Sequence, residues 1–264
     1  MKYPAFQSLI DTMVSFGYDY EKEILGVENR RKALALTNNT TTLLGLSEHV
    51  RTMIYALLSN NRPWEPIAKN TANIDAIFSN YDIDSLKKAD PGDLVDKIKS
   101  IRCGNRQITK QMNQLKHNIE VLEKIEQENG SIDNYYRNTT LVDVVKNLSL
   151  DNGRYKLKMM GIPLVCEYLK GIGVDVIKPD TLLCRILGRL GYAKKIPATA
   201  WEAIEICKEI GKEYNLSQPI VDTVLWQYCA KDKFEVCTAT PKCCKCKVVN
   251  CPSRAQLQYK STAE

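Results

Sequence analysis

Histidine and long apolar runs are scarce in this chain, and each scarcity argues against a class of protein. There are two histidines among 264 residues, His49 and His117, and they fall on separate expected helices. A Ser–His–Asp or Cys–His mechanism is therefore not expected. No stretch approaches the roughly 20 apolar residues of a membrane span, and the N-terminus lacks the apolar core of a signal peptide. We expect a cytoplasmic protein without a membrane partner.

The alternation of apolar and polar residues that is typical of strands is also scarce, whereas apolar residues often recur with the period of a helix. In residues 181–190, for example, five apolar side chains share one helical face. The sequence therefore predicts an all-α protein. The predicted helices cover residues 5–16, 18–36, 46–59, 65–79, 84–88, 91–101, 105–128, 140–148, 161–171, 181–190, 199–214 and 217–229.

The net charge of +6 is unevenly distributed along the chain. Residues 151–195 hold nine lysines and arginines against four acids, and residues 226–264 hold seven against three. Two basic segments predict a surface that binds a polyanion. Ordinary solvated helix faces are the alternative interpretation.

Ten cysteines are many for a reducing cytosol, and five of them crowd into "CTATPKCCKCKVVNC" at 237–251. Cys237, Cys243, Cys246 and Cys251 have the spacing C-x5-C-x2-C-x4-C, with Cys244 as an extra thiol. Four thiolates so close in sequence predict one metal centre, either a tetrahedral zinc or a four-iron cluster. The spacing alone does not choose between these metals.

Two further features precede the cysteines. A short turn around Gly161 joins two helical stretches, and backbone amides at such a turn predict a phosphate site. A simple helix–helix connection with Gly161 as a C-cap is the alternative. Asp180 follows Pro179 and directly precedes a helical pattern, which is the position of an N-cap.

The order of these elements closely resembles the helix–hairpin–helix DNA glycosylase superfamily. The nearest likeness is the endonuclease III branch, whose four cysteines hold a [4Fe-4S] cluster. A helix–turn–helix is followed by "KPDTLLCRILGRLG", then by "LWQYCAKDKFEVC" and the cysteine cluster. The resemblance covers roughly residues 46–252. It includes "VRTMIYALLSNNRPWEPIAKN", which is similar to the family's early helix and base-displacing loop.

The resemblance implies a fold of two helical lobes with the active cleft between them. Residues 38–160 would form a barrel-like lobe. Residues 1–37 and 161–264 would form the second lobe, with the second hairpin helix and the cysteine loop. The implied activity is that of a base-excision-repair DNA N-glycosylase. We expect it to act as a monomer on double-stranded DNA carrying a lesion or mismatch, and to associate with the nucleoid in a prokaryote.

Under this resemblance Asp180 matches the family's catalytic aspartate. Cleavage of an N-glycosidic bond builds positive charge on the sugar, and a fixed carboxylate stabilises that charge and helps to activate water. The cysteines Cys237, Cys243, Cys246 and Cys251 would hold the [4Fe-4S] cluster, with zinc as the alternative. The residues expected to contact DNA are Asn60, Asn61 and Arg62 in the base-displacing loop, Met160 and Gly161 in the hairpin, and Lys178.

The chain departs from the family at the position of the lysine that attacks the sugar in lyase-active members. That position falls at Pro163, which cannot form a Schiff base. We therefore expect a monofunctional glycosylase that uses water. The alternatives are a bifunctional glycosylase and lyase using Lys158 or Lys170, and a DNA-binding module without catalysis.

Two motifs also differ from the family pattern. The hairpin's usual Gly-h-Gly appears as Met159-Met160-Gly161, so one glycine remains. The cysteine loop is one residue short in two of its three intervals relative to the family's C-x6-C-x2-C-x5-C. These differences leave the phosphate grip and the identity of the metal open.

Overall fold

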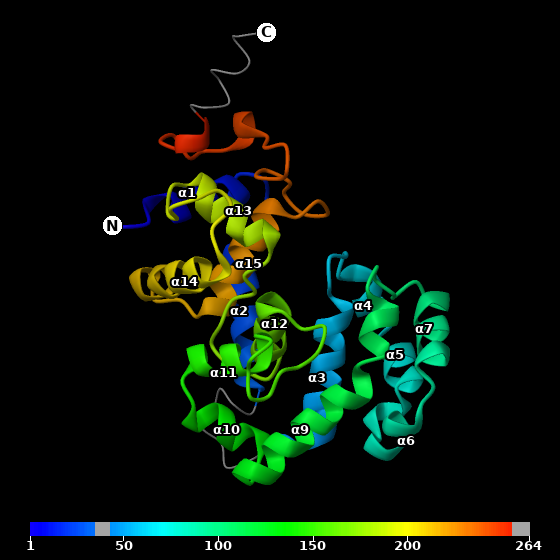
Figure 1. Ribbon diagram of the computed structural model, residues 1–264. Helices are drawn as coiled ribbons and strands as arrows, with labels where there is room; N and C mark the ends of the chain where they lie inside the picture. The colour runs from blue at the N-terminus through cyan, green and yellow to red at the C-terminus, as the bar shows by residue number, and fades with distance from the viewer. Residues whose placement is uncertain (35–42, 255–264) are drawn as a thin grey trace. The chain divides into compact units, whose positions relative to one another are not determined.

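The computed structural model describes residues 1–34 and 43–254, which contain helices and no strand (Figure 1). The all-α class expected from the sequence is confirmed. Within these ranges no helix has the length and the apolar character needed to cross a membrane. The contacts divide the chain into unit 1, Met1–Ala33 with Asp175–Glu264, and unit 2, Leu34–Val174.

Unit 1 is built around one buried helix, α15. Its sequence, QPIVDTVLWQYC, is apolar on most sides, which is typical of a helix packed by neighbours all around. Helices α1, α2, α13 and α14 all pack against it. The elements of unit 1 are α1 (Pro4–Val14), α2 (Tyr20–Lys32), α13 (Thr181–Arg189), α14 (Ala200–Tyr214), α15 (Gln218–Cys229) and the 3-10 turn η2 (Cys243–Lys245).

Unit 2 is built around α3, which packs against α8, α9 and α12. Residues Met53, Ile54, Leu57 and Leu58 of α3 are fully buried. The elements of unit 2 are α3 (Leu46–Leu58), α4 (Glu65–Lys69), α5 (Thr71–Ile77), η1 (Ser79–Tyr81), α6 (Ile83–Lys88), α7 (Pro91–Ser100), α8 (Ile108–Met112), α9 (Leu115–Asn129), α10 (Ile132–Asn138), α11 (Leu141–Ser149) and α12 (Ile162–Gly171).

The unit boundaries differ from the expected lobes. The expected boundary at residue 160 falls before α12, whereas the contacts place α12 in unit 2 because it packs against α3. The other expected boundary, between residues 37 and 38, lies outside the described residues.

Two predicted helices, 65–79 and 105–128, are wrong as single elements. Residues 65–79 form α4 and α5 with Asn70 between them, and η1 begins at Ser79. In place of the helix at 105–128 the chain forms α8 and α9, with Asn113 and Gln114 between them. Tertiary bonds made by side chains on either side explain the break between α8 and α9. Gln111 donates to the Leu57 carbonyl (3.2 Å) and Asn118 donates to the Lys158 carbonyl (3.0 Å).

Helix α10, which the sequence pattern did not predict, is part of a buried polar chain in unit 2. Asp133 accepts the Leu44 amide (2.8 Å) and contacts His49 Nε2 (3.0 Å), and His49 Nδ1 contacts the Tyr168 hydroxyl (2.8 Å). Burial opposes ionisation of Asp133, but the hydrogen bonds from His49 and Leu44 outweigh it and lower the pKa of Asp133. These hydrogen bonds join α3, α10 and α12. We interpret them as structural because the side chains of His49, Asp133 and Tyr168 are all fully buried.

Candidate functional site

Asp180 caps the N-terminus of α13 in unit 1. Its Oδ1 atom accepts the amides of Leu182 (2.8 Å) and Leu183 (3.1 Å). No hydrogen bond to Oδ2 is found within the described part of the chain, and Asp180 is partly exposed. The N-cap geometry therefore fixes the carboxylate through one oxygen and leaves the second available to a ligand.

The segment that leads to Asp180 is held by α15. Asp222 accepts the Lys178 amide (3.3 Å), and Asp175 accepts the amide of Gln218 (2.9 Å). Asp222 and Gln218 are both buried, and the Asp180 amide itself donates to the Lys178 carbonyl (2.7 Å). These bonds attach the segment that contains Lys178 and Asp180 to α15, the most buried helix of unit 1. Asp222 and Gln218 are supporting residues that the sequence pattern gave no reason to select.

Cys184 follows Asp180 on the first turn of α13 and donates to the Pro179 carbonyl (3.5 Å). Burial, together with the charges of Asp180 and Glu202, raises the pKa of Cys184 to about 11. A thiol with a raised pKa is a poor nucleophile at neutral pH. Cys184 is therefore not a candidate nucleophile, and Asp180 is the candidate functional side chain at this helix start.

The turn before α12 in unit 2 contains one non-glycine residue in the left-handed conformation. Met159 has a φ of 61°, and the Met160 amide donates to the Leu157 carbonyl (3.3 Å) to close the turn. A non-glycine residue in this conformation costs roughly 1–2 kcal/mol. Met160 is fully buried, so it takes part in the turn rather than offering its side chain to solvent.

Two side chains hold this strained turn. Asn118 of α9 accepts the Lys158 amide (2.7 Å) and donates to the Lys158 carbonyl (3.0 Å). The Lys156 ammonium donates to the carbonyls of Met160 (3.0 Å) and Ser149. Burial lowers the pKa of Lys156. The turn is therefore tied both to α9 and to the last residue of α11.

The amides that follow the turn are the ones suited to an anion. Gly161 is the exposed N-cap of α12, and neither its amide nor that of Ile162 has a backbone acceptor in the described ranges. Pro163 has no amide, and it occupies the first turn of α12, where a missing donor costs nothing. Two amides without a backbone acceptor at the positive end of a ten-residue helix form an arrangement that suits a phosphate.

The loop after α3 carries the other predicted DNA contacts. Asn61 is exposed with a φ of 49°, and the Asn60 amide donates to the Leu57 carbonyl (3.2 Å). Arg62 donates to the carbonyls of Gly104 (2.8 Å) and Arg102 (2.6 Å). Arg62 is thus engaged in fixing two loops together, whereas Asn61 projects from the loop tip.

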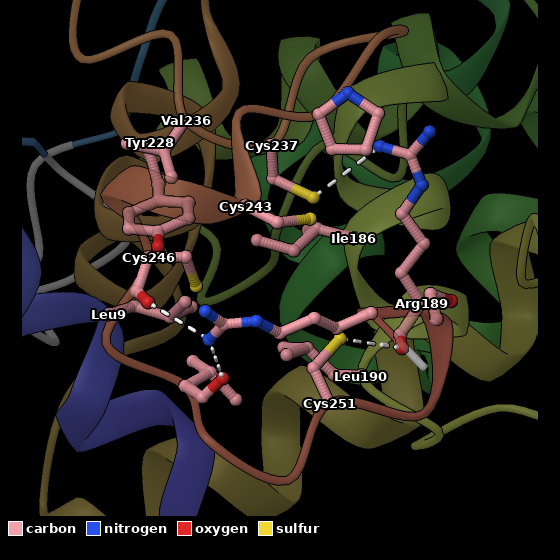
Figure 2. Close-up of a pocket in the computed structure, with 14 residues that line it drawn as sticks. Leu9, Ile186, Arg189, Leu190, Tyr228, Val236, Cys237, Cys243, Cys246 and Cys251 are labelled. Atoms are coloured by element: carbon pink, nitrogen blue, oxygen red, sulfur yellow. Dashed lines mark hydrogen bonds between the residues drawn. The ribbon is translucent and has the colours of Figure 1, made fainter. Parts of the chain in front are cut away.

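The four predicted metal-binding cysteines line one cavity in unit 1 (Figure 2). The cavity has a volume of about 30 Å³, with Leu9, Ile186 and Tyr228 among its apolar walls. This volume is about the share of one water molecule in the liquid. All ten cysteines are free thiols. The fold therefore brings cysteines from across residues 237–251 to the lining of one small cavity.

Positive charge accompanies these thiols. Arg189 of α13 donates to the Cys237 sulfur (3.5 Å), and Cys251 donates to the Arg189 carbonyl (3.3 Å) (Figure 2). Arg189 also donates to the Ala239 carbonyl (2.9 Å). Hydrogen bonding from Cys229 and the guanidinium of Arg189 lower the pKa of Cys237 to about 6. The cysteine loop is therefore attached to the last turn of the helix that begins after Asp180.

The other thiols of the cavity influence one another. Burial, followed by the thiols of Cys246, Cys237 and Cys251, raises the pKa of Cys243. Within residues 1–34 and 43–254, no group of three or more His, Cys, Asp or Glu side chains is arranged to hold a metal ion. Four thiols are the donor set that zinc and iron–sulfur centres use, but the described residues do not bring these four into an arrangement that holds a metal ion.

Comparisons of the chain with protein-family models, with curated proteins and with solved structures gave no match. The resemblance to helix–hairpin–helix glycosylases therefore depends on the order of the residues and motifs in this chain.

Proposed function

We propose that the protein is a DNA N-glycosylase that removes a damaged or mispaired base from duplex DNA. The observation that carries the proposal is Asp180, which is capped through Oδ1 while Oδ2 has no hydrogen-bond partner among the described residues. Its place in the chain, after a turn whose Gly161 and Ile162 amides have no backbone acceptor and before a four-cysteine loop, matches the glycosylase order.

In the proposed reaction, the bond between C1′ and the base nitrogen breaks and the base leaves with the electron pair. The carboxylate of Asp180 stabilises the positive charge that develops on the sugar. A water oxygen then bonds to C1′, and its proton passes to the Oδ2 side of Asp180. The same proton then passes to the departing base, directly or through solvent, which restores the carboxylate. The products are a free base and an abasic site.

The hairpin has a separate role in the proposal, which is to hold the DNA backbone. The amides of Gly161 and Ile162 would bind a phosphate oxygen at the start of α12. Asn61, at the exposed tip of the loop after α3, would fill the space left when the base is extruded. Both contacts come from unit 2, whereas Asp180 belongs to unit 1.

The cysteine loop would have a structural role. Cys237, Cys243, Cys246 and Cys251 would hold the [4Fe-4S] cluster, with zinc as the alternative, and the bound group would crosslink the loop. Four protein thiolates leave no open coordination position for a substrate. The bonds of Arg189 to the loop connect this crosslink to α13, so an ordered loop would also steady the helix that positions Asp180.

The proposal is tested with duplex oligonucleotides that carry uracil or thymine mismatches, oxidised purines, oxidised pyrimidines or alkylated purines. Each is incubated with the protein and analysed with and without hot alkali. We expect breaks only after alkali for at least one lesion, because water leaves an abasic site intact. Breaks without alkali would indicate a lysine nucleophile and a bifunctional enzyme. Tight binding with no breaks on any lesion would contradict the proposal and favour the non-catalytic module.

A further inference from the structure

Residues 97–119 of unit 2 form a basic segment to which neither the predicted sites nor the proposed reaction assigns a role. They contain six lysines and arginines and no aspartate or glutamate. Lys97 pairs with Asp93 (2.7 Å). The other five bases are exposed and form no ion pair with any described residue. These five, here called the basic belt, are Lys99, Arg102, Arg106, Lys110 and Lys116.

The segment 97–119, which carries the basic belt, is attached to the loop that contains Asn61. Arg62 donates to the carbonyls of Arg102 and Gly104, which ties the belt to the residue directly after Asn61. Asn105 donates to the Leu57 carbonyl (2.9 Å), which also accepts Gln111 (3.2 Å). Leu57 lies in the last turn of α3, so the base of the loop and the belt form one bonded assembly.

The belt is attached to the hairpin as well. Asn118, two residues after Lys116, hydrogen-bonds to both the amide and the carbonyl of Lys158, and its side chain is fully buried. The strained Met159 directly follows that peptide. A single acid-free segment therefore bonds to both loops that the proposed function places on DNA.

We propose that the basic belt is a binding surface for the phosphate backbone of duplex DNA. This inference rests on the proposed function for the choice of DNA as the partner. Exposed, unpaired lysines and arginines on one segment are suited to phosphate oxygens, which repeat along a duplex without regard to sequence. The hydrogen bonds to the neighbouring loops hold the segment that carries these cations against the Asn61 loop and the turn at Lys158, so that binding does not require the segment to be ordered first.

The test uses the full chain and a short undamaged duplex labelled with fluorescein. The variant Arg102→Gln, Arg106→Gln, Lys110→Gln removes three belt charges. The control Lys22→Gln, Lys88→Gln, Lys208→Gln removes three exposed charges elsewhere. Fluorescence anisotropy gives the association constant between about 50 and 200 mM salt. Circular dichroism and the thermal midpoint establish that each variant is folded.

The slope of log K against log salt concentration is negative, and we expect it to become less negative by roughly 2.7 in the belt variant, or about 0.9 per lost phosphate contact. The control should keep the wild-type slope. If the wild type binds the duplex and the two variants have equal slopes, the belt is overturned while the proposed function stands. If the wild type shows no salt-dependent binding to duplex DNA, the proposed function fails together with the belt.

Discussion

The two roles of Asp180 can be separated by one pair of substitutions. Asp180→Asn keeps an oxygen that can accept the Leu182 and Leu183 amides, and asparagine is as good an N-cap as aspartate. It loses only the interaction of the charge with the helix dipole, about 0.3–1 kcal/mol. Asp180→Ala loses the cap and should lower the free energy of unfolding by about 0.5–2 kcal/mol.

The effect on excision should be much larger than the effect on stability. Removal of one fixed electrostatic contact to a transition state costs about 100- to 1000-fold in rate, which corresponds to about 2.7–4 kcal/mol of activation free energy. We expect at least this loss for both Asp180→Asn and Asp180→Ala in single-turnover base excision. The asparagine variant should therefore be nearly as stable as wild type and nearly inactive.

A matched control comes from the N-cap of α7. Asp90 accepts the Asp93 amide (2.8 Å) in unit 2 and also precedes a helix, but it has no part in the proposed reaction. Asp90→Asn should change the unfolding free energy as little as Asp180→Asn and leave excision unchanged. Chemical denaturation and alkali cleavage of a lesion duplex measure the two quantities. Excision by Asp180→Asn within tenfold of wild type would refute the catalytic role and leave Asp180 as an N-cap.

Three further predictions concern the hairpin, the buried polar chain and the cysteines. Met159→Gly should raise the free energy of unfolding by about 0.5–1 kcal/mol in chemical denaturation, since glycine removes the left-handed strain at some entropic cost; a destabilised variant would contradict the turn geometry. Because its pKa is lowered in the folded protein, ionised Asp133 stabilises the fold at pH values above its unfolded pKa of about 4. This stabilisation is lost as the pH falls through the pKa of Asp133 in the folded protein. Asp133→Asn should therefore flatten the loss of stability below about pH 4 in acid titrations; an unchanged acid slope would exclude this source. Cys243→Ser should lose bound metal, and any absorbance near roughly 400 nm, whereas the exposed Cys244→Ser should keep them; equal metal content in the two variants would contradict the predicted ligand set.

The sequence predicted helices best where a helix buries one continuous apolar face. The patterns at 46–59 and 181–190 correspond to α3 and α13, and the N-cap predicted for Asp180 is present. The pattern at 105–128 failed because the break between α8 and α9 depends on Gln111 and Asn118 reaching carbonyls distant in sequence. No local periodicity contains that information.

The supporting residues of the candidate site could not be identified from the sequence, because their partners are also distant in sequence. Asp222 fixes the Lys178 amide, and Asn118 fixes the Lys158 peptide, through bonds between residues about forty positions apart in sequence. A polar residue inside an apolar helix is visible in the sequence, but its partner is not. The acid-free run at 97–119 is different, because a charge count over a shorter window finds it directly.

The most direct test of the central claim is the detection of free base in solution. The wild type and Asp180→Asn are incubated with lesion duplexes, and the released base is identified by mass spectrometry while sodium borohydride is added in parallel to trap any Schiff base. The account predicts free base from the wild type, none from Asp180→Asn, and no trapped covalent adduct. Absence of free base for every lesion tested, from a protein that binds those duplexes tightly, would contradict it.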